Sequence, residues 1–438
     1  MSRCVGSRSG NFGWKAAARD GVLAARACVR SLVIWRLRLA TLLPGLPELG
    51  GVCVLVGRLL AAGIAALVFA GVAHASPKRL TPVVEARIDA TAQQELASGC
   101  VAGVAIAVLK NGKLVYANGY GRANLELGAP VNAGTVFRIG SLTKQFTAAG
   151  VLLLAQQGKL NVDDKLSVYL PDFPRANEVT LRDLLNHTSG IHNFTEGAVI
   201  DKIATSGATV DQLVADIAGQ SPLYDFEPGT GWWYSNSNYA LLGAVIEKVS
   251  GRSWAAFMKA EIFDRLGTAD TAADDARDIV AGRASGYSLA GTAPGKFRNA
   301  DFTDMSVPYA AGALRSTIGD LSRWNAALFG GKLLRPDSLK DMLAPGRLRN
   351  GAADQTAIAW PGGKAYPPPP GLTPGYYAFG LDHHSQDGRR VVGHDGSIAG
   401  FDSVMQTYVD EGLTIIVLTN TDGAAHPLEA KIAKILAP

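Results

Sequence analysis

Two groups of β-rich runs stand near opposite ends of this chain, and together they limit the folds that it can adopt. Residues 101–121 contain two runs rich in Val, Ala and Tyr around Asn111-Gly112, a pair typical of a β-hairpin turn. Residues 389–396, 403–409 and 413–420 form three further strand-like runs. Strands joined by hairpins are antiparallel, so the sequence predicts one largely antiparallel sheet in which the first and last strands meet.

Most of the sequence around and between these runs has the spacing of helices. Helices are expected within residues 79–97, 140–160, 181–191, 208–219, 238–250, 254–266, 318–329 and 428–436. The predicted fold class is therefore α+β: an antiparallel sheet from the N- and C-terminal segments, flanked by helices, with an all-α lobe inserted. The α/β lobe is expected at about 77–140 and 300–438, and the helical lobe at about 141–300.

A proline-rich stretch runs from Pro361 to Tyr376 in the second half of the chain. Proline lacks the backbone N–H and is disfavoured inside helices and central strands. We therefore expect this stretch to be an extended surface loop.

Charge divides the chain into a basic leader and a nearly neutral body. The first 76 residues hold eight arginines and Lys15 against Asp20 and Glu48, a net charge of +7, whereas the whole chain carries +4. The body therefore carries −3 and shows no basic stripe. This charge pattern argues against nucleic-acid binding.

A short hydrophobic run near the end of the leader has the form of a secretory signal. Arg58 precedes the apolar residues 59–73, and the small-x-small triplet Ala-His-Ala ends at Ala75. The run is shorter than the roughly 20 residues of a membrane span. We expect residues 1–75 to be a leader cleaved after Ala75, giving a secreted or periplasmic domain at 76–438; an uncleaved membrane anchor is the alternative. Because the first 50 or so residues exceed an ordinary n-region, we expect translation to start near Val52–Val56.

The segment Ser141-Leu-Thr-Lys144 opens an otherwise apolar helix and places both polar side chains on one face. Ser141 could simply cap the helix while Lys144 is solvated. However, an ammonium in apolar surroundings is costly without partners, and a buried lysine with a lowered pKa can activate a neighbouring hydroxyl. Ser141 is therefore a candidate nucleophile, and Lys144 a candidate activating group.

Two further triplets follow in order, Tyr234-Ser235-Asn236 and His394-Asp395-Gly396, together with the stretches LRDLLNHTSGI and GALRSTIGDLSRW. With Ser-x-x-Lys, they make the chain resemble the serine β-lactamase and penicillin-binding-protein superfamily, closest to its class C β-lactamase, DD-carboxypeptidase and esterase branch. The matches are in family order and cover roughly residues 84 to 420.

The resemblance implies roles for the first two motifs. Ser141 would form an acyl-enzyme, and Lys144 and Tyr234 would titrate as a coupled acid–base pair in which the identity of the base has no unique answer. Asn236 would contact the substrate and position Lys144. No metal and no organic cofactor is implied.

The third motif departs from the lysine found in typical β-lactamases. His394 would be mostly neutral at pH 7, and family members with histidine here are more often peptidases, D-aminopeptidases or esterases. Efficient β-lactam hydrolysis is therefore less expected. Backbone N–H groups of Ser141 and Ser397 would form the oxyanion hole, and Gly396 would let the acyl group approach the strand closely.

Simpler interpretations exist for several of these residues. Tyr234 could be a half-buried aromatic, Asn236 a turn residue, and His394 an inert residue at a strand end. His187, within LRDLLNHTSGI, is expected to be structural and to orient a loop under the site. The adjacent pair His383-His384 is expected in a solvated hairpin and not in a metal site, since neighbouring strand residues face opposite ways.

These observations predict a secreted serine hydrolase that acts through an acyl-enzyme on Ser141. The expected partners are small-molecule or peptide substrates: D-residue peptides, esters, amides or β-lactams. A catalytically silent envelope sensor or peptide-binding module is the alternative, because folds can outlive their chemistry.

Overall fold

The central sheet is built from both ends of the chain, as the sequence predicts. The computed structural model describes residues 79–291, 293–353 and 371–437. Within these residues an antiparallel sheet has the order β3-β2-β1-β13-β12-β11-β10-β9. Its strands are β1 (Gly103–Lys110), β2 (Lys113–Asn124), β3 (Ala129–Pro130), β9 (Leu372–Ala378), β10 (Leu381–Gln386), β11 (Arg389–Ile398), β12 (Phe401–Tyr408) and β13 (Leu413–Thr419). β1 pairs directly with β13, from Val104 opposite Thr419 to Lys110 opposite Leu413.

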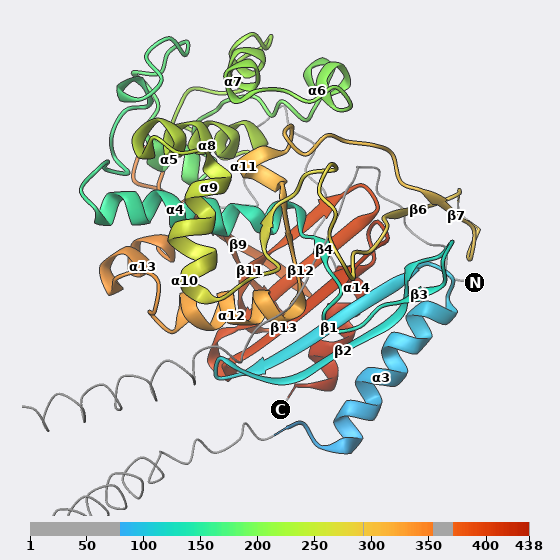
Figure 1. Ribbon diagram of the computed structural model, residues 1–438. Coiled ribbons are helices and arrows are strands. Elements are labelled where there is room, and N and C mark those ends of the chain that lie inside the picture. The colour runs from blue at the N-terminus through green and yellow to red at the C-terminus, as the bar shows by residue number, and fades with distance from the viewer. Residues whose placement is uncertain (1–78, 292, 354–370, 438) are drawn as a thin grey trace, which may run out of the picture. The chain divides into compact units, whose positions relative to one another are not determined.

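Helices cover both faces of this sheet (Figure 1). They are α3 (Pro82–Ala97), α4 (Thr143–Gln156), α5 (Leu181–Leu185), α6 (Ala198–Ile203), α7 (Val210–Ala218), α8 (Asn236–Ser250), α9 (Trp254–Met258), α10 (Asp264–Leu266), α11 (Tyr309–Gly312), α12 (Ile318–Phe329), α13 (Pro336–Met342) and α14 (Ala425–Ile435). The observed fold class is α+β, in agreement with the prediction.

The alternation of side chains along β1 divides the interior into two cores. Val104, Ile106 and Val108 pack with α3 and α14 on one face. Ala105 and Ala107 face the other core, which contains α4, α5, α8, α9 and α12. Because both faces are covered, seven of the eight β1 residues are buried.

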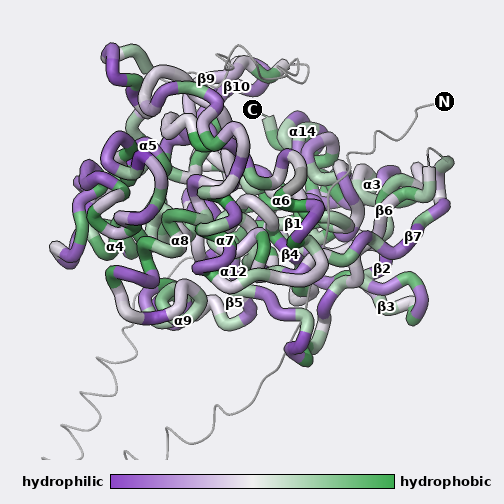
Figure 2. The backbone as a smooth tube through the Cα atoms, turned by 90° about the horizontal axis from the view of Figure 1, so that it is seen from above, coloured by the Kyte–Doolittle hydropathy of each residue, from purple (hydrophilic) through white to green (hydrophobic). Residues whose placement is uncertain are grey.

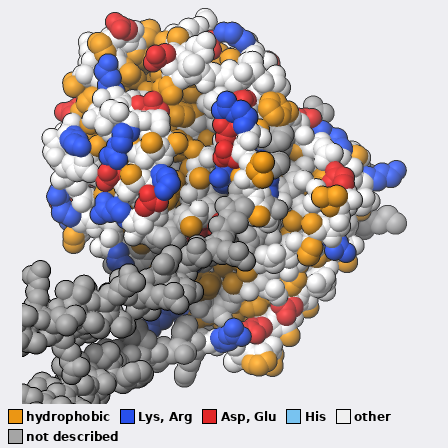
Figure 3. Space-filling view, in the orientation of Figure 1, with side chains coloured by type: hydrophobic (Ala, Val, Ile, Leu, Met, Phe, Trp, Pro, Cys, Tyr) orange, Lys and Arg blue, Asp and Glu red, His pale blue; other side chains and the backbone are white. Residues whose placement is uncertain are grey.

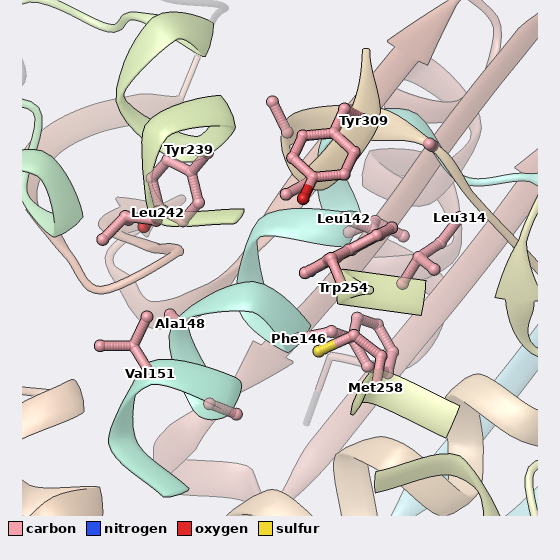
Figure 4. Packing of buried hydrophobic residues seen from close by; sticks show 14 of the residues in the cluster. Leu142, Phe146, Ala148, Val151, Tyr239, Leu242, Trp254, Met258, Tyr309 and Leu314 are labelled. Atoms are coloured by element: carbon pink, nitrogen blue, oxygen red, sulfur yellow. The ribbon is translucent and has the colours of Figure 1, made fainter. Parts of the chain in front are cut away.

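α4 is the helix at the centre of the larger core, and twelve of its fourteen residues are buried. Its side chains meet those of α8 and α9 in the cluster of Figure 4, where Phe146 lies beside Met258. Viewed from above, hydrophobic stretches gather in α4 and α8, whereas hydrophilic stretches lie mainly along the outside (Figure 2). The predicted amphipathic helices are therefore observed, but α4 itself is buried on nearly all sides.

The expectation of a loop through Tyr376 is wrong at its C-terminal end. β9 begins at Leu372 and includes Pro374. β9 is an edge strand, where a missing N–H need not interrupt a ladder on the open side, and its register with β10 shifts beside Pro374. Residues 361–370 of the stretch lie outside the described residues.

Several predictions concern residues 1–78, which lie outside the described residues. They are the leader, Arg58, the cleavage position after Ala75 and the start near Val52–Val56. Among the residues described, no helix is long and apolar enough to span a membrane. The two-lobe division stays a prediction; β5 (Ala272–Ala273), β6 (Tyr287–Leu289) and β7 (Phe297–Asn299) are short strands within the expected helical lobe. β4 (Phe137–Arg138) and β8 (Leu314–Ser316), whose residues lie outside the expected helical lobe, form an antiparallel pair.

Candidate active site

Ser141 lies in a tight 3-10 turn, Gly140–Leu142, between β4 and α4. The residue that caps α4 is Leu142, which offers no side-chain hydrogen bond, so Ser141 does not serve as the helix cap. Gly140 has a φ of +45°, which favours glycine. A Cβ on Gly140 would lie 2.9 Å from the backbone N of Ser397, so the turn packs directly against β11.

β11 and the turn approach each other so closely that Gly396 has no room for a side chain. A Cβ there would overlap the carbonyl oxygen of Ile139 and lie 2.8 Å from the backbone N of Ser141. The close contact at Gly396 is therefore between β11 and the turn that carries Ser141, whereas the approach of an acyl group to this strand stays a prediction. Ser141 and Ser397, whose N–H groups are the predicted oxyanion donors, line the same cavity.

The hydroxyl of Ser141 contacts two of the residues that the motifs indicate. Lys144 Nζ lies 2.9 Å from Ser141 Oγ, and Tyr234 Oη donates a hydrogen bond to the same oxygen at 2.8 Å. Nζ also donates to Asn236 Oδ1 at 2.8 Å and to the carbonyl oxygen of Ala311 at 2.9 Å. The structure therefore brings together the four motif residues Ser141, Lys144, Tyr234 and Asn236, as the sequence motifs suggested.

Burial shifts the pKa values of Lys144 and Tyr234 in opposite directions. Lys144 is fully buried, and burial lowers its pKa well below the ordinary value, only partly opposed by the Asp395 carboxylate. Burial raises the pKa of Tyr234 above its ordinary value. The surroundings therefore favour an uncharged amine beside an uncharged phenol.

Asn236, the first residue of α8, is held by its own set of contacts. Its backbone N–H donates to Asn193 Oδ1 at 3.0 Å, and its Nδ2 donates to Thr195 Oγ1 at 2.9 Å. Its amide oxygen is therefore left to accept from Lys144. The predicted contact between Asn236 and Lys144 is present. One of the two amide N–H groups donates to Thr195, and the predicted contact of the amide with a substrate stays a prediction.

His394 is buried with both ring nitrogens engaged. Nδ1 lies 2.5 Å from the carbonyl oxygen of Asp395 and must carry the proton, so Nε2, 2.9 Å from Tyr377 Oη, accepts from that hydroxyl. Burial lowers the pKa of His394, and the Asp395 carboxylate opposes this only in part. His394 is therefore a neutral ring and presents no positive charge to the cavity.

The motif residues line a cavity of about 570 Å³. Ser141, Tyr234, Asn236, His394 and Ser397 all contribute, beside apolar residues from several segments: Ile200, Val307, Pro308 and Ile398. Among the described residues, the cavity lining includes Asp395 and no Arg or Lys. A larger cavity of about 980 Å³ lies beside α12 and contains none of these residues.

Within the described ranges, no group of three or more His, Cys, Asp or Glu residues is arranged to hold a metal ion. His383 stacks on Tyr376 with ring centroids 4.2 Å apart, and His384 Nδ1 bonds to Asp382 at 2.9 Å. The pair does lie in the β10–β11 hairpin, but the His384 side chain is only 5% exposed. The expectation of a solvated pair is therefore wrong for His384.

A family model described as Beta-lactamase matches residues 88–437, which is most of the chain. The chain belongs to the β-lactamase family. This confirms the resemblance found in the sequence, and the fold agrees with it.

Several relatives of this β-lactamase-family chain are penicillin-binding proteins. It is 30% identical to penicillin-binding protein 4* of Bacillus subtilis (strain 168) over 327 residues, which is 72% of this chain and 67% of the relative. It is 33% identical to putative penicillin-binding protein PbpX of the same organism over 239 residues, 55% of this chain and 58% of the relative. The matched part thus spans about two thirds or less of these relatives.

Solved structures of amidohydrolases have the same fold. The D-stereospecific amidohydrolase from Streptomyces sp. is 28% identical with a TM-score of 0.65, covering 80% of this chain and 98% of that one. The D-amino acid amidase from Ochrobactrum anthropi SV3, complexed with L-phenylalanine amide, is 25% identical with a TM-score of 0.67, covering 81% and 98%. Family and neighbours together indicate a serine hydrolase.

Three contributors to this β-lactamase-family site were missed in the sequence. Thr195 follows the stretch LRDLLNHTSGI, and this proximity to a hallmark was the one available signal. Tyr377 lies at the end of the proline-rich stretch, which carried no motif. Ala311 contributes a backbone carbonyl, which any residue type supplies, so no sequence signal exists for it.

Proposed function

We propose that this chain is an acyl-enzyme-forming serine hydrolase of amides and esters, including those of D-amino acids. The observation that carries the proposal is the placement of Ser141 Oγ between Lys144 Nζ and Tyr234 Oη in an open-sided cavity. A nucleophile within hydrogen-bond reach of both a base and an acid is the arrangement that acyl transfer requires.

Acylation follows from this arrangement. Ser141 Oγ attacks the acyl carbon while its proton passes to the uncharged amine of Lys144. The backbone N–H groups of Ser141 and Ser397 stabilise the oxyanion. The phenol of Tyr234 then protonates the departing nitrogen or oxygen and recovers a proton from Lys144, so that the leaving group departs neutral. In deacylation, water attacks the acyl carbon while its proton passes to Tyr234 and the phenol proton passes to Lys144. Lys144 then returns a proton to Ser141 Oγ as the acid leaves, which restores the starting state.

The charges around the cavity favour substrates without a carboxylate near the scissile bond. His394 is neutral and bonded to Tyr377, and the described lining residues include no Lys or Arg. The acidic residue among them, Asp395, is paired with His426, so the described lining offers no unpaired cation to a carboxylate. Amides and esters fit these surroundings better than β-lactams or peptides ending in a free carboxylate. The similar D-amino acid amidase agrees with this choice.

One substrate panel tests the chemistry. D- and L-phenylalanine amide, p-nitrophenyl esters, D-Ala-D-Ala peptides and nitrocefin are each incubated with wild type, Ser141→Ala and Ser98→Ala. Ser98 is an exposed serine at the end of α3, on the opposite face of the sheet, and serves as the matched control. We expect turnover of amides and esters by wild type and Ser98→Ala, and none by Ser141→Ala. Full activity in Ser141→Ala would contradict the mechanism, and an inactive wild type would favour a silent binding module.

Replacing His394 by lysine tests the role of charge. The substitution places a cation where a neutral ring now stands, so we expect the rate of acylation by nitrocefin, relative to a p-nitrophenyl ester, to rise about tenfold or more. An unchanged ratio would show that charge at this position does not select the substrate.

We also propose that the protein is secreted after cleavage behind Ala75, on the basis of the leader's sequence pattern. N-terminal sequencing of the protein recovered outside the cytoplasm is expected to begin at Ser76. A mature form that retains residues 59–73 would support the membrane anchor instead.

A further inference from the structure

His187 is a buried residue next to the candidate site that the proposed chemistry does not use. It follows α5 with a φ of +60°, in the left-handed region that favours glycine and asparagine. Its carbonyl oxygen accepts the N–H of Trp233 at 3.1 Å, and its ring Nδ1 accepts the N–H of Ser235 at 3.2 Å. Both chain neighbours of Tyr234 are therefore held by this one residue.

The ring of His187 has a defined tautomer. Ser189 Oγ donates to Asn238 Oδ1 at 2.6 Å, so the amide nitrogen of Asn238 faces His187 and donates to Nδ1 at 3.1 Å. Since Nδ1 accepts from two donors, the proton is on Nε2. Within the described residues, Nε2 has no hydrogen-bond partner. Burial keeps the pKa of His187 well below its ordinary value.

Aromatic rings surround this neutral imidazole. Its centroid lies 4.5 Å from that of Tyr234, 4.6 Å from Tyr377 and 5.2 Å from Tyr239. The imidazole therefore supports the Tyr234 ring from the side as well as holding its backbone. A shift of the ring by a fraction of an ångström would lengthen the 2.8 Å bond from Tyr234 Oη to Ser141 Oγ.

We propose that His187 is a positioning residue, which fixes the backbone and ring of Tyr234 so that its phenol stays directed at Ser141. The inference rests on the proposed function, because it is there that Tyr234 delivers a proton. A second consequence is that the positive φ of His187 serves the site, because in this conformation the carbonyl and Nδ1 face the two neighbours of Tyr234 at once.

Two substitutions of His187 separate the effect of the Nδ1 acceptor from the effect of the positive φ. His187→Gly tolerates a positive φ but removes the acceptor and the ring. His187→Asn also tolerates a positive φ and places its amide Oδ1 where Nδ1 now accepts. Each is made alone and together with Tyr234→Phe, and kcat/KM is measured for a p-nitrophenyl ester, with circular dichroism and Tm as controls of folding.

We expect His187→Gly to lower kcat/KM by roughly tenfold to a hundredfold, mainly through kcat, and His187→Asn to recover most of this loss. In the Tyr234→Phe background the same His187→Gly change is expected to cost less than about twofold, because the phenol that it positions is already absent. A merely structural role would give equal losses in both backgrounds.

Equal losses in both backgrounds, or a His187→Gly enzyme with wild-type kcat/KM, would overturn the inference. If His187→Gly does not fold, His187→Asn decides alone: a folded His187→Asn variant that loses more than tenfold contradicts the role of the acceptor. Ser141→Ala is measured in parallel. Full activity there contradicts the proposed function, whereas an inactive Ser141→Ala beside an unaffected His187→Gly contradicts the positioning role only.

Discussion

Asn236→Asp is the substitution that most directly probes how Lys144 works. Asn236 Oδ1 accepts from Lys144 Nζ at 2.8 Å, and Lys144 is fully buried. The substitution keeps the size and the acceptor oxygen but adds a negative charge beside the amine. An adjacent carboxylate favours the charged form of a lysine, so the pKa of Lys144 must rise.

The size of this rise follows from the distance. Two unit charges 2.8 Å apart attract by about 6 kcal/mol at an effective dielectric constant of about 20. The new carboxyl is also buried and its own pKa rises, so only part of this energy acts on Lys144. A change of about one to three in pKa is the range observed for carboxylates beside cations, and we expect the same for Lys144.

The assay is the pH dependence of kcat/KM for a neutral p-nitrophenyl ester. Activity requires the unprotonated amine, so it rises with pH through the lowered pKa of Lys144 and stays high while Tyr234 remains protonated. In Asn236→Asp the rising limb is expected to move to higher pH. At a pH below both limbs, kcat/KM of the variant is about tenfold lower for each pH unit by which its limb has moved, and above both limbs the two enzymes converge.

Asn236→Leu is the control, since it removes the amide without adding charge. It is expected to lower the rate across the pH range without moving the limb to higher pH. An Asn236→Asp limb that stays in place, or that moves to lower pH, would refute the assignment of Lys144 as the group that must lose its proton.

Three further changes test other parts of the structure. Gly396→Ala places a Cβ against the carbonyl of Ile139, so both Tm and acylation should fall; normal acylation would contradict the packing of β11 on the Ser141 turn. Phe146→Ala, in the core of α4, should cost about 3–5 kcal/mol in denaturant unfolding, and a loss below about 1 kcal/mol would contradict its burial. Burial opposes the charged form of His426, but Asp395, 3.7 Å away, outweighs it and raises the pKa of His426 to about 9. This stabilisation is complete below the ordinary pKa near 6.5 and lost as pH rises through about 9. Because the His426–Asp395 pair is half exposed, His426→Gln should lower the free energy of unfolding by at most about 1 kcal/mol at pH 6. At pH 10 it should have no effect. Equal losses at pH 6 and pH 10 would argue against the ion pair.

The charge pattern of the surface is consistent with an enzyme of small substrates. On the face in Figure 3, basic and acidic side chains are interspersed over the helical part, without a stretch of one sign. The sequence already indicated this, because its net positive charge belongs to the first 76 residues.

Local signals predicted the elements that depend on local geometry. Asn111 and Gly112 both have positive φ, as the tight hairpin turn between β1 and β2 requires. α12 begins and ends where its periodicity predicts, because the side chain of Thr317 caps it and Gly330 follows it. The prediction was wrong at Pro374 because a proline destabilises a central strand much more than an edge strand. The position of β9 in the sheet depends on the other strands and cannot be read from its own sequence.

The sequence also left open which member of the Lys144–Tyr234 pair is the base, and burial together with the hydrogen-bond pattern favours one assignment. A protonated Lys144 would donate to Ser141 Oγ as Tyr234 does, and the serine proton would then have no acceptor among the described contacts. An uncharged Lys144 has two N–H groups, which match Asn236 Oδ1 and the Ala311 carbonyl, and one lone pair, which faces Ser141. A charged pair, in which Lys144 donates to all three oxygens and a Tyr234 phenolate accepts from Ser141, would satisfy the same contacts. Burial disfavours both charges of that pair. We therefore propose that the amine acts as the base and Tyr234 as the acid.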